Sequence, residues 1–179
     1  SSCILSFSNR IKWTPEDATK THISAILEKK CIPLDYIDSF TTTTTLFLNK
    51  ANIEFKDISL IPIHGDCHKG NFIVRPGEGM FLTDFDDMSV GPAIQDVWML
   101  LSEAMDFDSQ ELDWFKDGYE TFRNFPYDQL KLIPFLKGMR IIHYIAWIAM
   151  QSEDEGFSET FPEFGTTRYW NETIRELQG

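Results

Sequence analysis

The pattern of apolar and polar residues predicts helices at both ends of the chain and a short β region between them. Thr14 suits the N-cap of a helix and Pro15 its first residue, and apolar residues at i, i+3 and i+4 follow them. We therefore expect a helix from Thr14 to about Lys30. A second helix is expected from Pro33 to about Asn52. The five consecutive threonines 41–45 weaken that prediction, because threonine is a poor helix former.

The middle of the chain reads as strands and turns. An apolar, β-branched run, 58–63, leads into the loop HGDCHKGN. Phe72-Ile73-Val74 then reads as a strand, 75–79 as a turn, and Met80 to Thr83 as a returning strand. We therefore expect one small β-hairpin directly after the loop.

The rest of the chain predicts mainly helices. Residues 1–13 show no period and are expected to be a frayed end or part of a missing connection. Leu112, Phe115, Tyr119 and Phe122 are spaced as a helix face that packs into a core. Helices are expected at about 92–105, 108–125, 128–151 with a kink or break near Pro134 and Gly138, and 165–177, with an acidic loop at 152–163.

Three polar residues of the β region form a candidate for phosphoryl transfer. Asp66 and Asn71 lie five apart in the loop, and Asp84 follows the second strand. A hairpin brings Asn71 and Asp84 together, since the open ends of its strands are neighbours. One carboxylate would accept a hydroxyl proton, while an amide and a carboxylate would hold Mg²⁺. The simpler interpretation of an isolated Asp or Asn among glycines is a turn former.

Two other readings of this loop carry less weight. A zinc site of His64, Cys67 and His68 has no second pair of ligands at zinc spacing. His64 fits a histidine that anchors the loop through the backbone better than an acid or a base.

The linked motifs resemble a known family. H-x-D-x-x-x-x-N followed by D-F-D is similar to the catalytic pattern of protein-kinase-like phosphotransferases, in the aminoglycoside/choline kinase branch. The further motifs FxxDxDD, GPAxQDxWMLL and MRxxxYxAW resemble the stress response kinase A group (RdoA type) of serine/threonine protein kinases. The resemblance is close from about Ile63 to Gln151. It implies a protein-kinase-like α+β fold, here a mainly helical C-terminal lobe whose small hairpin carries the catalytic loop.

The resemblance also implies roles for individual residues. Asp66 becomes the catalytic proton acceptor, and Asn71 and Asp84 the Mg²⁺ ligands, with Asp84 also counted as catalytic. Ile73 would lie under the adenine of ATP. His68 would contact phosphate if protonated, and Lys69 could replace it electrostatically.

Asp96 resembles a buried helix aspartate that supports the catalytic loop through its backbone, and a structural role is the preferred interpretation. Asp86 and Asp87 remain either solvated charges or support for the metal ligands.

The resemblance leaves one part of a kinase without a counterpart. No glycine precedes Gly65, and none of the six earlier lysines lies in a strand that suits an ATP-binding lysine. We expect residues 1–179 to be a single C-terminal lobe, with the N-terminal ATP-binding lobe absent from this chain. Three functions stay open: a serine/threonine protein kinase, a small-molecule kinase for an amino alcohol or sugar, and an inert lobe that binds a partner.

Composition narrows the class of protein. The chain has 179 residues, of which 42% are hydrophobic, enough for a sizeable core. A net charge of −12 argues against nucleic acid and anionic membranes as partners. Three scattered cysteines suggest a reducing compartment, and no signal peptide or apolar run long enough to span a membrane is evident, so we expect a cytoplasmic protein.

Overall fold

The computed structural model describes residues 10–101 and 110–179, which form two compact units. Of the described residues, the first unit contains 10–13, 58–101 and 110–133, and the second contains Thr14–Asp57 and Pro134–Gly179. The described part of the first unit mixes short strands and helices. The second unit is helical.

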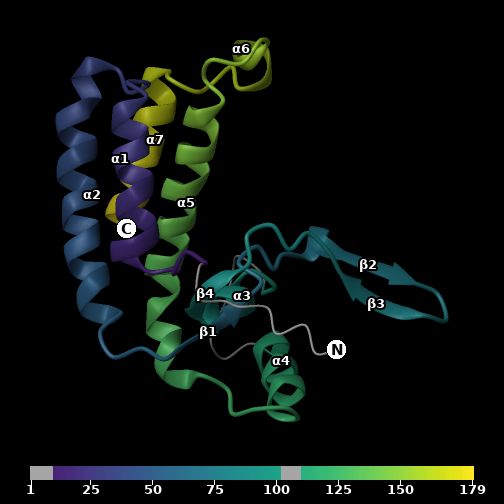
Figure 1. The fold of residues 1–179 in the computed structure, drawn as a ribbon. Helices are drawn as coiled ribbons and strands as arrows, with labels where there is room; N and C mark the ends of the chain where they lie inside the picture. The colour runs from purple at the N-terminus through teal and green to yellow at the C-terminus, as the bar shows by residue number, and fades with distance from the viewer. Residues whose placement is uncertain (1–9, 102–109) are drawn as a thin grey trace. The chain divides into compact units, whose positions relative to one another are not determined.

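The second unit is built from helices that lie side by side in Figure 1. Its N-terminal helix begins as a π-helical turn, and the side chain of Thr14 accepts a hydrogen bond from the Asp17 N–H, as the predicted N-cap requires. The predicted spans 14–30, 33–52 and 165–177 are thus confirmed to within a few residues. The elements are the π-helical turn Pro15–Thr19, α1 (Lys20–Glu28), α2 (Leu34–Glu54), α5 (Ile133–Met150), α6 (Phe157–Thr160) and α7 (Thr167–Gln178).

Burial explains why the threonine run is helical. Phe40, directly before it, is fully buried and meets the ring of Trp170 from α7 edge-on, with 5.6 Å between ring centroids. The Thr44 hydroxyl, also buried, donates to the Phe40 carbonyl at 2.8 Å, so its polar group is satisfied inside the helix. Packing therefore overrides the weak helix propensity of threonine.

The predicted break near Pro134 is confirmed, but Gly138 has another role. A 3₁₀ segment, Tyr127–Leu132, changes to α5 at Ile133, directly before the proline. Gly138 continues the helix. A Cβ atom there would lie 2.4 Å from Cε2 of Phe47, so glycine lets α2 and α5 approach closely.

One expectation about membranes needs correction. Residues Tyr127–Met150 are long and apolar enough to cross a membrane by length and composition alone, contrary to the sequence analysis. However, 56% of the most apolar window is buried inside the protein. Leu136, Met139 and Ile142 are fully buried, which is the behaviour of a core helix.

The first unit contains two separate two-stranded antiparallel sheets. The predicted hairpin is confirmed, with Phe72 paired to Leu82 and Arg75 paired to Gly79. Strand β4 was not predicted, because its four residues include Gly91 and Pro92. The elements are β1 (Leu60–Ile63), β2 (Phe72–Arg75), β3 (Gly79–Leu82), β4 (Ser89–Pro92), α3 (Ile94–Trp98) and α4 (Gln110–Glu120).

Strand β4 holds both β1 and the segment expected to be frayed. Ile63 pairs with Ser89, and Leu60 with Pro92. On the other side, the Trp13 N–H donates to the Val90 carbonyl at 2.8 Å. Residues 11–13 are therefore part of the fold, whereas residues 1–9 lie outside the described residues.

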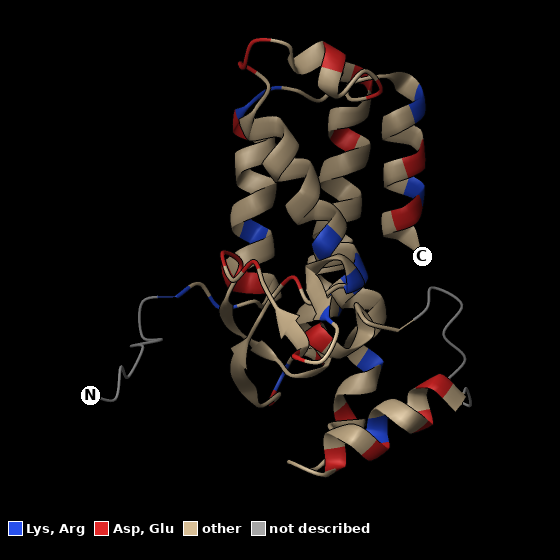
Figure 2. Ribbon diagram, turned by 90° about the vertical axis from the view of Figure 1, so that its right-hand side faces the viewer, with Lys and Arg blue, Asp and Glu red and all other residues tan. Residues whose placement is uncertain are grey.

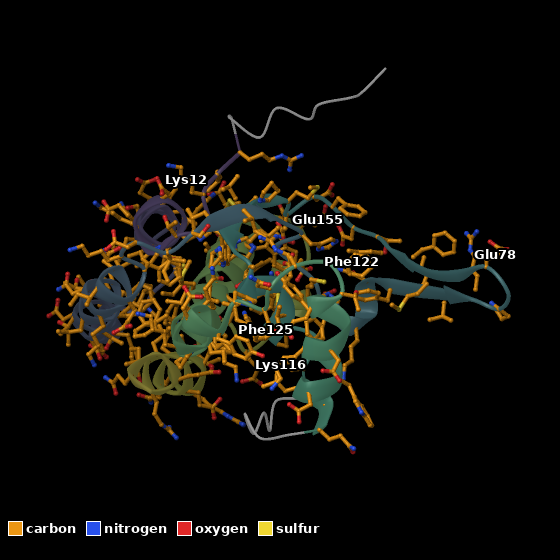
Figure 3. All side chains as sticks on the ribbon, turned by 90° about the horizontal axis from the view of Figure 1, so that it is seen from below. Lys12, Glu78, Lys116, Phe122, Phe125 and Glu155 are labelled. Atoms are coloured by element: carbon orange, nitrogen blue, oxygen red, sulfur yellow. The ribbon has the colours of Figure 1, made fainter. Side chains whose placement is uncertain are left out.

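The predicted helices around 92–125 are shorter in the structure. Helix α3 ends at Trp98, and the predicted end near Met105 and the cap at Asp108 lie outside the described residues. Helix α4 ends at Glu120, and Figure 2 shows that its charged residues are mostly acids, with Lys116 as the one base. Leu112 is buried as predicted, but Phe122 is 92% exposed because the helix ends before it (Figure 3).

Candidate active site

The loop between β1 and the hairpin is held in a conformation that requires glycine at position 65. Gly65 has a φ of +86°, which L side chains rarely adopt. A Cβ atom there would lie 2.2 Å from the backbone oxygen of Asp87. The loop therefore packs directly on the backbone that follows Asp84.

Asp66 and Asn71 are joined across this loop. The Asn71 side-chain nitrogen donates to the Asp66 carbonyl oxygen at 2.8 Å and lies 3.4 Å from the Asp66 carboxylate. These bonds fix which way the amide points. Its oxygen, Oδ1, accepts no hydrogen bond from the described residues and is the atom that suits a hard cation.

The hairpin brings Asp84 next to Asn71. Both the N–H and the hydroxyl of Thr83 donate to the Asn71 carbonyl oxygen, at 2.9 and 3.1 Å. Asp84, the next residue, is exposed and has a φ of +61°, uncommon for a residue with a side chain. No hydrogen bond or ion pair from the described part of the chain engages its carboxylate. Two unengaged oxygen ligands thus stand on residues at the open end of the hairpin.

His64 anchors the loop, as expected. Its Nε2 lies 2.9 Å from the Thr83 carbonyl oxygen, and since a carbonyl only accepts, Nε2 carries the proton. Its ring packs against Phe85 with 4.9 Å between centroids. Nδ1 is buried without a partner among the described residues. The role of His64 is to hold the loop against the strand end that carries Asp84.

Asp96 supports the loop through its backbone, which confirms the sequence expectation. Its two carboxylate oxygens accept the N–H groups of His64 and Gly65, at 2.7 and 2.9 Å. The neighbouring Gln95 is fully buried and donates to the Gly65 carbonyl at 3.1 Å. Sequence reasoning assigned no role to Gln95, although the motif GPAxQDxWMLL contains it beside Asp96.

The burial of Asp96 predicts a pH dependence of stability. Desolvation raises the pKa of its carboxyl above the ordinary value, and the bonds from His64 and Gly65 offset this in part. The folded state therefore binds a proton more readily than the unfolded state, and this contribution to stability falls as pH rises from about 3.8 through the folded pKa.

We expect the Asp96→Asn variant to lack this slope. Urea unfolding of both proteins across that pH range gives the difference in unfolding free energy, wild type minus variant, which should decrease with rising pH. A difference that grows with pH would contradict the raised pKa.

His68 and Lys69 both have partners within the first unit. His68 Nδ1 accepts the Gly70 N–H at 3.0 Å, and His68 Nε2 lies 3.5 Å from the Asp66 carboxylate. Lys69 lies 3.6 Å from a carboxylate oxygen of Glu111 on α4. Both residues lie on the same short loop as Asp66. Contact of either side chain with phosphate stays a prediction.

Ile73 lies on β2 and is 47% exposed. It follows Asn71, the last residue of the 3₁₀ segment Lys69–Asn71, by two residues. Its contact with adenine stays a prediction.

The described residues give no support to zinc or to a reactive thiol in the loop. Within residues 10–101 and 110–179, no three His, Cys, Asp or Glu side chains gather as a metal site. Burial, together with Asp96 and Asp66, raises the pKa of Cys67 to about 12. The thiol therefore stays protonated and poorly nucleophilic at neutral pH.

Comparisons with known proteins agree with this geometry. Residues 50–133 match the model of the phosphotransferase enzyme family. The chain is 36% identical over 115 residues to stress response kinase A of Escherichia coli K12. It is also 36% identical over 114 residues to the serine/threonine protein kinase RdoA of Salmonella typhimurium. Each match covers 64% of this chain and 34% of the relative, so the chain spans about a third of the relatives' length.

A solved structure shows the fold. The amicoumacin kinase hAmiN, in complex with AMP-PNP, Ca²⁺ and Ami, matches 93% of this chain and 51% of its own, with a TM-score of 0.60 and 18% identity. The predicted protein-kinase-like α+β fold is therefore confirmed.

Proposed function

We propose that this chain is the C-terminal lobe of a longer ATP- and Mg²⁺-dependent kinase that phosphorylates serine or threonine hydroxyls on proteins. The observation that carries the proposal is the bonded unit of Asp66, Asn71 and the strand end bearing Asp84. The two relatives named as kinases support it. The upstream ATP-binding lobe and a cytoplasmic location are part of the proposal.

The donor set fits the expected metal. Mg²⁺ prefers oxygen ligands and needs only one or two from the protein when phosphates supply others. Asn71 Oδ1 and the Asp84 carboxylate are two such oxygens, both unengaged by the described residues. When bound, Mg²⁺-ATP would supply the phosphoryl group and neutralise its charge.

The remaining chemistry is assigned to this chain's own side chains. The Asp66 carboxylate would orient the acceptor hydroxyl and take its proton. The hydrogen bond from the Asn71 side chain to the Asp66 carbonyl would hold Asp66, the proton acceptor, at a fixed position relative to Asn71, the metal ligand. Ile73 would support the adenine. Acceptor choice would depend on the helices and loops of this lobe.

The test is phosphoryl transfer by the longer protein that carries the upstream lobe. The protein is given γ-labelled Mg-ATP together with a protein mixture and a pool of small-molecule alcohols, amino alcohols and sugars. We expect label on protein serine or threonine. Label only in the small-molecule fraction would assign a small-molecule kinase instead, and no label together with no Mg-dependent ATP binding would assign an inert lobe.

A further inference from the structure

A cavity of about 550 Å³ lies in the second unit, between α2, the start of α5 and the end of α7. Its volume falls within the range of small-molecule sites. None of the residues proposed for phosphoryl transfer lines it. The cavity therefore needs an explanation of its own.

The last turn of α7 borders the cavity beside the middle of α2. The Gln178 side chain, at the last residue of α7, donates to the Thr43 hydroxyl at 3.3 Å. Helix α2 continues from Thr43 to Glu54, about three more turns, with α5 beside it. Residues of α2 and α5 form the rest of the cavity lining.

The floor of the cavity is apolar. Phe47 and Phe135 approach with 6.1 Å between ring centroids, and Phe47 also covers Gly138, where no side chain intervenes. Leu177 of α7 is buried and lines the cavity, whereas Leu46 lines it and is half-exposed. An apolar or aromatic body therefore fits this floor.

The rim of the cavity carries unpaired charges. Asp38 and Lys50 lie on the α2 face, twelve residues or roughly 18 Å apart along the helix axis, and Glu176 comes from α7. None of the three has a hydrogen bond or ion pair with the described residues. Glu172 of α7, in contrast, is paired with Arg168, and Figure 2 shows acids and bases alternating along α7, the helix that ends at C.

We propose that this cavity binds a small amphiphilic molecule with an apolar body and a cationic head. The apolar floor takes the body. The rim is net negative, because it carries the carboxylates of Asp38 and Glu176 and only one ammonium group, that of Lys50. The rim therefore favours a cation over an anion. A head placed at the Asp38 end lies about three helical turns from Lys50, which limits repulsion.

Three probes with the same ten-carbon tail test the proposal: decyltrimethylammonium, decyl sulfate and decyl glucoside. Binding to the 179-residue protein is measured by calorimetry below the micelle concentrations. We expect the cationic probe to bind about tenfold more tightly than the sulfate, the size of one or two exposed charge interactions. The glucoside should lie between them.

Variants locate the binding. Asp38→Asn/Glu176→Gln should remove the preference for the cation. The matched pair Asp35→Asn/Glu172→Gln makes the same charge change on the same two helices, outside the cavity, and should keep that preference. Thr42→Trp places a larger side chain at an exposed position of the lining and should weaken the binding of all three probes. The proposal would be overturned by equal affinity for the three probes or by equal effects of the two double variants on the preference for the cation. Undiminished binding to the Thr42→Trp variant would overturn it as well.

Discussion

Asp66→Asn is expected to lower phosphoryl transfer by the two-lobed protein by about 100- to 10,000-fold, the range that a positioned general base supplies. Asparagine keeps the size of the side chain but cannot take the hydroxyl proton. The Asp66 backbone carbonyl, which accepts the Asn71 amide, is unchanged by the substitution. The rate loss should therefore come without loss of fold.

Two measurements accompany the rate. Mg-dependent ATP binding should persist, because the proposed metal ligands Asn71 and Asp84 remain. Asp117→Asn makes the same charge change at an exposed position of α4 and should transfer at the rate of the unmodified protein. An unchanged transfer rate in Asp66→Asn would mean that Asp66 does not take the proton. An equal loss of transfer rate in Asp117→Asn would mean that the loss comes from the change in net charge and not from the loss of a proton acceptor.

Gly65→Ala should destabilise the protein far more than Gly77→Ala. Both glycines have positive φ, +86° and +80°, so each alanine meets about 1–2 kcal/mol of backbone strain. Only the new Cβ at position 65 meets an atom, the Asp87 backbone oxygen at 2.2 Å, whereas nothing lies within 4 Å at Gly77. A further loss of about 1–3 kcal/mol is expected from that overlap.

Urea unfolding of the two alanine variants checks this difference. Because backbone cannot move aside as a flexible side chain can, Gly65→Ala should also disturb the loop whose N–H groups bind Asp96. Equal losses of unfolding free energy in the two variants would mean that the loop relaxes without cost, and the close packing on Asp87 would then not matter for stability.

Helices were predictable where the sequence carries explicit caps. Thr14 and Thr166 both act as N-caps through their side chains, and the helices after them begin where expected. The hairpin was predictable because turn residues separate two short apolar runs. Caps and turn residues are local signals, so they can be recognised without knowledge of the tertiary structure.

The features that the sequence did not predict depend on distant contacts. Strand β4 is defined by its pairing with β1, which lies nearly thirty residues earlier. Phe122 has the spacing of a core residue, but the helix ends before it. Gln95 stands in the motif GPAxQDxWMLL, but its role is recognised only from its bond to Gly65. The approach of Asn71 to the strand end that bears Asp84 was predictable because a hairpin connects the two.

The β2–β3 hairpin has a consequence for handling the protein. Val74 and Met80, a cross-strand pair, are 71% and 66% exposed, and the side chains point outward from the strands, with Glu78 at the tip (Figure 3). In the described residues each strand pairs only with the other, so both outer edges offer free backbone groups. A chain of this length made alone should self-associate as its concentration rises, by adding strands from neighbouring molecules, and short peptides of β-forming sequence should act as capping agents that keep it monomeric.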